Sequence, residues 1–221
     1  MNDVSVIIPA YNEEARIEHT IKAIRRIPGI HEVIVVNDGS VDGTSRIAHL
    51  YADVTIDIEK NVGKGNALLV GWRMAQGELI ACVDADLEET ASELEKLIVP
   101  IRENRADLAI STIKTGEKAG FGLVKRRAQA IVYKYTGMNV ISPLSGQRVF
   151  RRKWLTLLLE QEYRGFGVEI KMTVDFILAG AKIIEVETCM AHREMGKSFA
   201  GFYHRFKQWV DIERHMKVVR K

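Results

Sequence analysis

Short apolar runs alternate with segments of helical periodicity over the first half of the chain. The runs are rich in β-branched residues and are bounded by turn formers, as expected of strands buried in a sheet. Between the first two runs, Ile17, Ile21 and Ile24 recur at the spacing of one helical face. Such alternation favours an α/β fold with a mostly parallel central sheet and helices on both faces. The predicted strands are Val4–Ile8, Val33–Val36, Val54–Ile58, Leu79–Val83 and Leu108–Ser111.

Turn and capping residues indicate where the helices between these strands begin. Pro9 is expected to end the first strand, and Asn12 to cap the helix that follows it. Asp42 or Thr44 is expected near the cap of the second helix. Further on, Thr90 and Glu93 have the spacing of a capping box, which predicts a helix that reaches about Val99.

The second half of the chain has a less regular pattern. Residues 143–152 predict a turn and a short strand, and residues 165–180 predict a loop that enters a helix. A late strand is expected at Ile183–Val186. The final segment, residues 195–221, has an apolar and aromatic stripe at helical spacing and predicts an amphipathic helix.

The totals are those of a globular protein with a sizeable core. The chain has 221 residues, of which 47% are hydrophobic and 28% charged, and its net charge of +3 is too small to indicate nucleic-acid binding. The charge is uneven, because residues 195–221 carry +5 and the rest −2. No apolar run approaches the length of a membrane span, so a cytoplasmic protein is expected. Cys82 and Cys189 lack metal-site spacing, and burial as free thiols is expected.

The chemistry is concentrated after the strand at Leu79–Val83. Asp84 and Asp86 follow it one residue apart, and side chains two apart in an extended segment point the same way. Ligands of open α/β sheets sit at the carboxyl ends of the strands. Two ionised carboxylates this close need a cation or a shared proton, and hard oxygen ligands select Mg²⁺ or Mn²⁺. The alternative is a solvated acidic turn, to which Glu88 and Glu89 would contribute.

Four segments together resemble the family 2 glycosyltransferases, which have the GT-A fold. They read VSVIIPAYNEE, EVIVVNDGSVDGT, NVGKGNAL and VDADLE, in the family's order. PLSGQRVFRR and GFGVEI resemble the dolichyl- and polyprenyl-phosphate branch. PLSG, GFGVE and AHRE also resemble the glucosyl-3-phosphoglycerate synthase branch. The resemblance implies one GT-A domain, with a nucleotide-sugar half at 1–112, an acceptor half at 113–194 and a tail at 195–221.

Carried over residue by residue, the resemblance implies a donor site and a metal site. Asp86 would be the direct ligand of Mg²⁺ or Mn²⁺, and His192 falls where the phosphoglycerate branch has a metal-binding histidine. Lys64 would approach the nucleotide, near its phosphates or base, and Asp38 would contact the base or ribose. The remaining residues implied at the nucleotide sugar are Pro9, Ala10, Tyr11, Glu13, Asp84 and Ala85.

The resemblance also implies an inverting transfer to an acceptor. A hydroxyl acceptor would need a general base, for which Glu169 is the candidate, whereas a phosphate acceptor is already an anion. Arg148 falls where the lipid branch keeps an arginine that can grip an acceptor phosphate bidentately. The other candidate acceptor residues are Ser145, Gly146, Lys125 and Arg126.

Two departures from the family pattern affect the acceptor more than the donor. The family commonly has two aspartates before Gly-Ser, but the first is Asn37 here; the lipid branch usually has Asp-Pro and Phe where this chain has Ser142-Pro143 and Gln147. Polyprenyl phosphate is the expected acceptor. The alternatives are a small acceptor such as phosphoglycerate, or a protein that binds a nucleotide sugar without catalysis.

Basic segments raise the question of membrane contact. Residues 114–135 carry six Lys/Arg against one acid, and the tail has cations beside its apolar stripe. Such helices can lie on an anionic membrane surface, here the inner face, although amphipathic helices usually pack on their own domain or on a partner.

Three other enzyme classes fit the sequence poorly. A haloacid-dehalogenase-like phosphatase would have Thr or Val at the position of Glu88. A P-loop would have Ser or Thr after Lys64, where this chain has Gly65. No Gly-x-Gly-x-x-Gly follows the first strand, which argues against a dinucleotide oxidoreductase.

Overall fold

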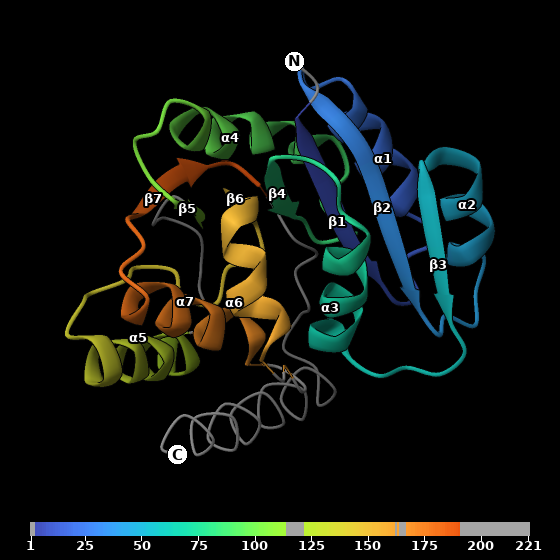
Figure 1. The fold of residues 1–221 in the computed structure, drawn as a ribbon. Coiled ribbons are helices and arrows are strands. Elements are labelled where there is room, and N and C mark those ends of the chain that lie inside the picture. The colour runs from blue at the N-terminus through green and yellow to red at the C-terminus, as the bar shows by residue number, and fades with distance from the viewer. Residues whose placement is uncertain (1–2, 114–121, 162, 164–166, 191–221) are drawn as a thin grey trace.

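A seven-stranded sheet organises the molecule (Figure 1). The computed structural model describes residues 3–113, 122–161, 163 and 167–190. The strand order is β3-β2-β1-β4-β6-β5-β7, and β6 alone among these strands runs antiparallel to its neighbours. The mostly parallel α/β sheet expected from the sequence is therefore confirmed. The strands are β1 (Val4–Ala10), β2 (Ile30–Asp38), β3 (Val54–Ile58), β4 (Leu79–Cys82), β5 (Leu108–Ile113), β6 (Arg148–Arg151) and β7 (Ile183–Thr188).

Helices cover both faces of this sheet, and each face has its own hydrophobic core. Alternate residues of a strand serve opposite faces: Ile7 packs in one of these cores, whereas Val6 and Ile8 pack in the other. One face is covered by α1 (Ile17–Arg25), α2 (Thr44–Tyr51) and α4 (Leu94–Arg102). The other is covered by α3 (Lys64–Met74), α5 (Gly122–Thr136), α6 (Leu155–Leu159) and α7 (Val168–Leu178).

Two helix starts differ from the sequence prediction because the expected caps serve other contacts. The first helix begins at Ile17, and Asn12 instead accepts a hydrogen bond at Oδ1 from the Val41 amide. Thr90 donates its hydroxyl to the Leu87 carbonyl, and a short 3₁₀-helix, η1 (Glu88–Glu93), precedes α4. A second, η2 (Arg152–Trp154), precedes α6. Asp42 and Thr44 do lie at the start of α2, as expected, and the Thr44 amide donates to Oδ1 of Asp42.

Strand β1 continues through Pro9, which was expected to end it. Its pairing with β4 stops at the Ile7–Cys82 pair, while its pairing with β2 continues to Ala10. Beyond Ile7 one side of β1 therefore has no ladder partner, so the missing amide hydrogen of Pro9 is tolerated there. This open end of the sheet is where the candidate site lies.

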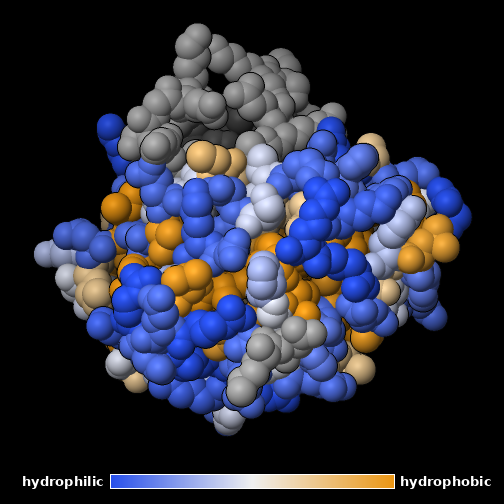
Figure 2. All heavy atoms as spheres, turned by 90° about the horizontal axis from the view of Figure 1, so that it is seen from above, coloured by the Kyte–Doolittle hydropathy of each residue, from blue (hydrophilic) through white to orange (hydrophobic). Residues whose placement is uncertain are grey.

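The surface is mostly polar, as Figure 2 shows for one face, with apolar side chains in smaller groups between charged ones. No helix within the described ranges is long and apolar enough to cross a membrane. Cys82 is buried as expected, and its burial raises the pKa of the thiol to about 11. Cys189 is exposed, so the expectation that both thiols are buried was wrong for that residue.

Candidate active site

The topology collects the conspicuous sequence motifs at one edge of the sheet. The carboxyl ends of the parallel strands β1, β2 and β4 lie at this edge. Because β6 is antiparallel, its first residue, Arg148, pairs with the last residue of β4, Cys82. The loop before β6 is thereby brought beside Asp84, which follows β4.

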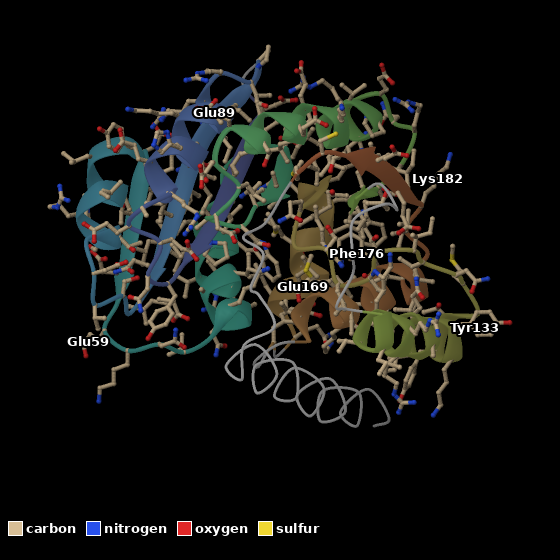
Figure 3. The ribbon with its side chains drawn as sticks, turned by 180° about the vertical axis from the view of Figure 1, so that it is seen from behind. Glu59, Glu89, Tyr133, Glu169, Phe176 and Lys182 are labelled. Carbon is tan, nitrogen blue, oxygen red and sulfur yellow. The ribbon has the colours of Figure 1, made fainter. Side chains whose placement is uncertain are left out.

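Lys64 is the centre of the site. It is the first residue of α3, and its ammonium group lies 2.6 Å from Oδ1 of Asp84 and 2.7 Å from Oε1 of Glu169. Burial alone would lower the pKa of Lys64, but the two carboxylates outweigh it and raise that pKa above its usual value. Figure 3 shows Glu169 near the middle of the molecule, where α7 begins. Lys64 thus supplies a positive charge between two acidic side chains from different elements.

The loop before β6, residues 143–147, lies against this cluster and is called the site loop. The side-chain amide of Gln147 donates a hydrogen bond of 2.9 Å from Nε2 to Oδ2 of Asp84, and its Oε1 accepts one from the Ser145 hydroxyl. A Cβ atom at Gly146 would lie 2.6 Å from both Oδ2 of Asp84 and Nζ of Lys64. A side chain at position 146 would therefore displace the Lys64–Asp84 pair. The partnership of Gln147 with Asp84 could not be found from the sequence, where Gln147 is only a departure from a motif.

Arg148 lies beneath this loop and does not line its outer surface. The residue is 1% exposed, and its guanidinium donates to the carbonyls of Pro143 and Ser145 and to the Thr173 hydroxyl. Burial lowers the pKa of Arg148 to about 10, so the side chain remains charged at neutral pH. In this arrangement Arg148 fixes the loop to α7. A direct contact with an acceptor phosphate stays a prediction.

Asp38 organises the approach to α3. It is buried at the end of β2, and its two carboxylate oxygens accept the amides of Val62 and Gly63 at 2.8 and 2.9 Å. These bonds fix the turn that leads into Lys64. The predicted contact of Asp38 with a base or ribose is not tested by this geometry, but its role in holding that turn was not foreseen.

The β1 and β2 loops are joined across the neighbouring part of the edge. The amides of Asn12 and Glu13 donate to the hydroxyls of Ser40 and Thr44. Ala10 is buried, Pro9 is half-buried, and Tyr11 is 47% exposed at the mouth of this region. Of these three residues, all expected at the nucleotide, Tyr11 is therefore the most accessible.

Asn37, the departure from the usual aspartate pair, has a structural partner. Its Nδ2 donates 2.7 Å to Oδ1 of Asp57 on β3, and its Oδ1 accepts the Ser40 amide. Asp57 also accepts the Ser45 hydroxyl and contacts Nε2 of His49. The Ser45 hydrogen bond is the main factor that lowers the pKa of Asp57. An amide at position 37 therefore satisfies a neighbouring carboxylate.

The residues expected to hold a metal are only partly within the described structure. Asp84 and the half-buried Asp86 provide hard oxygen donors, which fit Mg²⁺ or Mn²⁺. Strand β4 ends at Cys82 and residues 85 and 86 form a turn, so the extended-strand argument for a shared direction does not reach Asp86. His192 lies outside the described residues. Within the described ranges no cluster of three or more His, Cys, Asp or Glu forms a metal site.

The remaining acceptor candidates lie on α5. Lys125 is half-buried and Arg126 is exposed on that helix. A hydrogen bond of 2.8 Å from Gln129 to the Ile141 carbonyl connects α5 to the segment that leads into the site loop. The two cations thus belong to the element beside that segment.

Ligands of open α/β sheets bind at the carboxyl ends of the strands, which is the edge where Lys64 pairs with Asp84 and Glu169. The family model described as glycosyl transferase family 2 matches residues 5–157. The chain therefore belongs to glycosyl transferase family 2 and is a glycosyltransferase.

Known proteins of both anticipated branches are similar to it. The chain is 27% identical over 223 residues to the undecaprenyl-phosphate 4-deoxy-4-formamido-L-arabinose transferase of Proteus mirabilis, an alignment that covers 96% of this chain and 67% of that protein. A crystal structure of Mycobacterium tuberculosis glucosyl-3-phosphoglycerate synthase with Mn²⁺, UDP and glucosyl-3-phosphoglycerate gives a TM-score of 0.77 at 26% identity, covering 97% of this chain and 80% of that one. The same enzyme with Mg²⁺ and UDP shares the fold, with a TM-score of 0.78 at 24% identity, over 97% and 79% of the two chains.

Proposed function

We propose that this glycosyltransferase moves a sugar from a nucleoside-diphosphate donor to polyprenyl phosphate with the help of a divalent cation. The observation that carries the proposal is the position of Lys64 between Asp84 and Glu169, at the carboxyl edge of the sheet and against Gly146. Curated relatives named as undecaprenyl-phosphate sugar transferases support the lipid acceptor, and this chain spans about two thirds of their length.

The donor would be held by the ends of β1 and β2 and the start of α3. Tyr11 would contact the nucleoside, because it directly follows β1 and its side chain is exposed. Asp38 would act through the turn it holds, since its carboxylate binds the two amides that precede Lys64. Lys64 would then turn toward the donor diphosphate, whose two phosphates offer more negative charge than one carboxylate.

The divalent cation fits the carboxylate oxygens that follow β4. Mg²⁺ is usually held by one or two carboxylates together with substrate phosphates, so Asp86 would bind it, with His192 as the second candidate. When bound, the cation acts as a Lewis acid that neutralises the charge on the leaving diphosphate. Asp84 would stay hydrogen-bonded to Gln147 and would thereby keep the site loop closed over the sugar.

A phosphate acceptor explains the remaining geometry without a general base. The phosphate oxygen is already an anion and can attack the anomeric carbon directly, with inversion. Glu169 would then hold and orient Lys64, as it does in the structure. Arg148 would be a positioning residue that fixes Pro143 and Ser145, and the acceptor phosphate would meet the outer side of that loop.

A second candidate acceptor is a small phosphorylated molecule such as phosphoglycerate. It is favoured by the similarity to a glucosyl-3-phosphoglycerate synthase bound to its product, at 26% identity over 97% of this chain. The two candidates share the phosphate and differ in the lipid. They can therefore be separated by one competition experiment.

The test is transfer from a panel of UDP- and GDP-sugars, with Mn²⁺ or Mg²⁺, to detergent-solubilised polyprenyl phosphate. Phosphoglycerate is added as competitor, and thermal shifts report donor binding, because a ligand that binds the native state raises its melting temperature. We expect one donor to give a metal-dependent shift and a lipid-linked sugar, both reduced in Asp86→Asn. Transfer to phosphoglycerate alone would exclude the lipid, and donor binding with no transfer to either acceptor would favour a binding protein.

A further inference from the structure

The outer face of α5 exposes large apolar side chains beside cations. Leu123 is 84% exposed and Tyr133 is 54% exposed; in the segment after the helix, Met138 is 45% and Ile141 57% exposed. Figure 3 shows Tyr133 at the periphery of the molecule. Together with Arg126 and Lys134, these residues are called the α5 patch.

The exposed residues of α5 itself lie on one side of the helix and include cations but no acidic residue. The exposed positions of α5 recur three and four residues apart, which places them on one side of the helix. The helix carries Lys125, Arg126, Arg127 and Lys134 and has no acidic residue between Gly122 and Thr136. Arg126, Arg127 and Lys134 are all exposed. The exposed side of α5 thus carries two large apolar side chains, Leu123 and Tyr133, among cations, which suits a partner with an anionic surface and an apolar interior.

The segment that follows the α5 helix connects the α5 patch to the site loop. Gln129 of α5 bonds to the carbonyl of Ile141, and the amides of Ile141 and Ser142 both donate to the Glu185 carboxylate at 2.8 Å. These bonds fix the segment in which Met138 and Ile141 are exposed. The next residues, Pro143–Gln147, form the loop that closes on Asp84. A surface that bound the patch would therefore lie beside the segment that leads into this loop.

We propose that the α5 patch docks on an anionic lipid bilayer. The mix of residues favours a bilayer over a protein partner, because the buried cores of protein interfaces are depleted in charge, whereas interfacial helices combine Lys and Arg with exposed Leu and aromatic residues. Anionic headgroups attract each nearby cation, and the apolar side chains enter the headgroup boundary. This docking rests on the proposed function, because a lipid acceptor is what gives it a purpose. It adds to that function the surface at which the lipid acceptor would be met.

Vesicle flotation of the full chain tests the proposal. The vesicles contain equal amounts of phosphatidylglycerol and phosphatidylcholine, and pure phosphatidylcholine is the neutral comparison. We expect binding to the anionic vesicles only, weakened by added salt. Removing two cations with R126Q/K134Q is expected to weaken it about 25-fold, at about fivefold for each charge. L123S/Y133S is expected to weaken it at least about tenfold, because apolar burial is lost.

Matched controls remove the same groups elsewhere on the surface. Leu50→Ser deletes a leucine that is 65% exposed on α2, and R73Q/K182Q removes two exposed cations outside the α5 patch. Both should bind vesicles like the wild type. The proposal would be overturned if both patch variants bound the vesicles as strongly as the wild type. It would also be overturned if the wild type did not bind them. A dimer that L123S/Y133S converts to a monomer would overturn it in favour of a protein partner. Donor thermal shifts on the same variants test the proposed function separately.

Discussion

The ammonium group of Lys64 joins α3 to α7 through a 2.7 Å contact with Glu169, the residue that would be the base for a hydroxyl acceptor. The same ammonium lies 2.6 Å from Asp84. A carboxylate in this position serves the transfer in one of two ways: it takes a proton from the acceptor, or it holds Lys64 for the diphosphate. The proposed phosphate acceptor requires only the second.

Glu169→Gln separates these roles. Because a phosphate acceptor has no proton to lose, we expect the variant to keep single-turnover transfer to polyprenyl phosphate within about tenfold of wild type. A general base normally contributes a factor of about 10² to 10⁴. Single-turnover rates measured with saturating donor check the prediction. A loss of about a thousandfold that excess base in the buffer restores would show that Glu169 accepts a proton, and the assigned acceptor class would then be wrong.

Gly146→Ala tests the close approach of the loop to the charged cluster. The new methyl group would lie 2.6 Å from Nζ of Lys64 and from Asp84, so this pair must move. We expect donor affinity to fall at least about tenfold, a loss of about 1.4 kcal/mol in binding free energy. Titration calorimetry with the donor and metal measures it. Gly180→Ala is the control: it has open space but φ of +81°, so it should lower stability and leave donor affinity unchanged.

Arg148→Met distinguishes a positioning residue from a phosphate ligand. The carbonyls of Pro143 and Ser145 and the Thr173 hydroxyl would lose their donor, and we expect the free energy of unfolding to fall by about 3 kcal/mol. Urea denaturation measures the change. Arg73→Met, at an exposed arginine, is the control, and its free energy of unfolding should stay close to that of the wild type. The milder Thr173→Val should cost about 1 kcal/mol. Unchanged stability of Arg148→Met together with a selective loss of acceptor binding would assign Arg148 to the acceptor phosphate.

Asn37→Asp examines the unusual residue before the Asp-Gly-Ser segment. A carboxylate would replace the amide that now donates to Asp57 at 2.7 Å, and two like charges would face each other. We expect a loss of about 1–2 kcal/mol in unfolding free energy at neutral pH. Asp57→Asn in the same chain should restore part of it, since the new amide can donate in the opposite direction. Additive effects of the two substitutions in a double-mutant cycle would contradict a direct contact.

The strands were readable from the sequence because burial on both faces gives continuous apolar runs. Val33–Val36 is fully buried, and the structure extends that strand only at its ends. Helix starts were less predictable, since Asn12 uses its side chain on the Val41 amide of another loop. The 15-residue helix α5 was not predicted, because its apolar residues are spread around a strongly basic segment.

The sequence predicted which residues belong to the candidate site better than it predicted which of them contact one another. The motifs identified Lys64, Asp84 and Glu169, but each was expected to face a ligand, and their pairing depends on how α3, β4 and α7 converge in space. Arg148 was expected at the acceptor, but β6 lies inside the sheet, where Arg148 pairs with Cys82 on one side and Ile110 on the other, and sequence periodicity does not reveal this position.

The raised pKa of Asp175 predicts a pH dependence of the free energy of unfolding. It lies on α7, where it accepts hydrogen bonds from Lys171 at 2.8 Å and from the Tyr163 hydroxyl at 3.1 Å, and burial raises its pKa above the ordinary value of 3.8. Between 3.8 and that raised pKa the folded chain holds a proton that the unfolded chain lacks, so this residue adds stability as the pH falls through the window.

Asp175→Asn lacks the proton site and leaves the buried Lys171 without its carboxylate. We therefore expect the variant to be less stable than wild type at neutral pH, and the difference in unfolding free energy to widen toward pH 4. Urea denaturation at a series of pH values checks this, and a difference that narrows on acidification would show that the pKa of Asp175 is lowered in the fold.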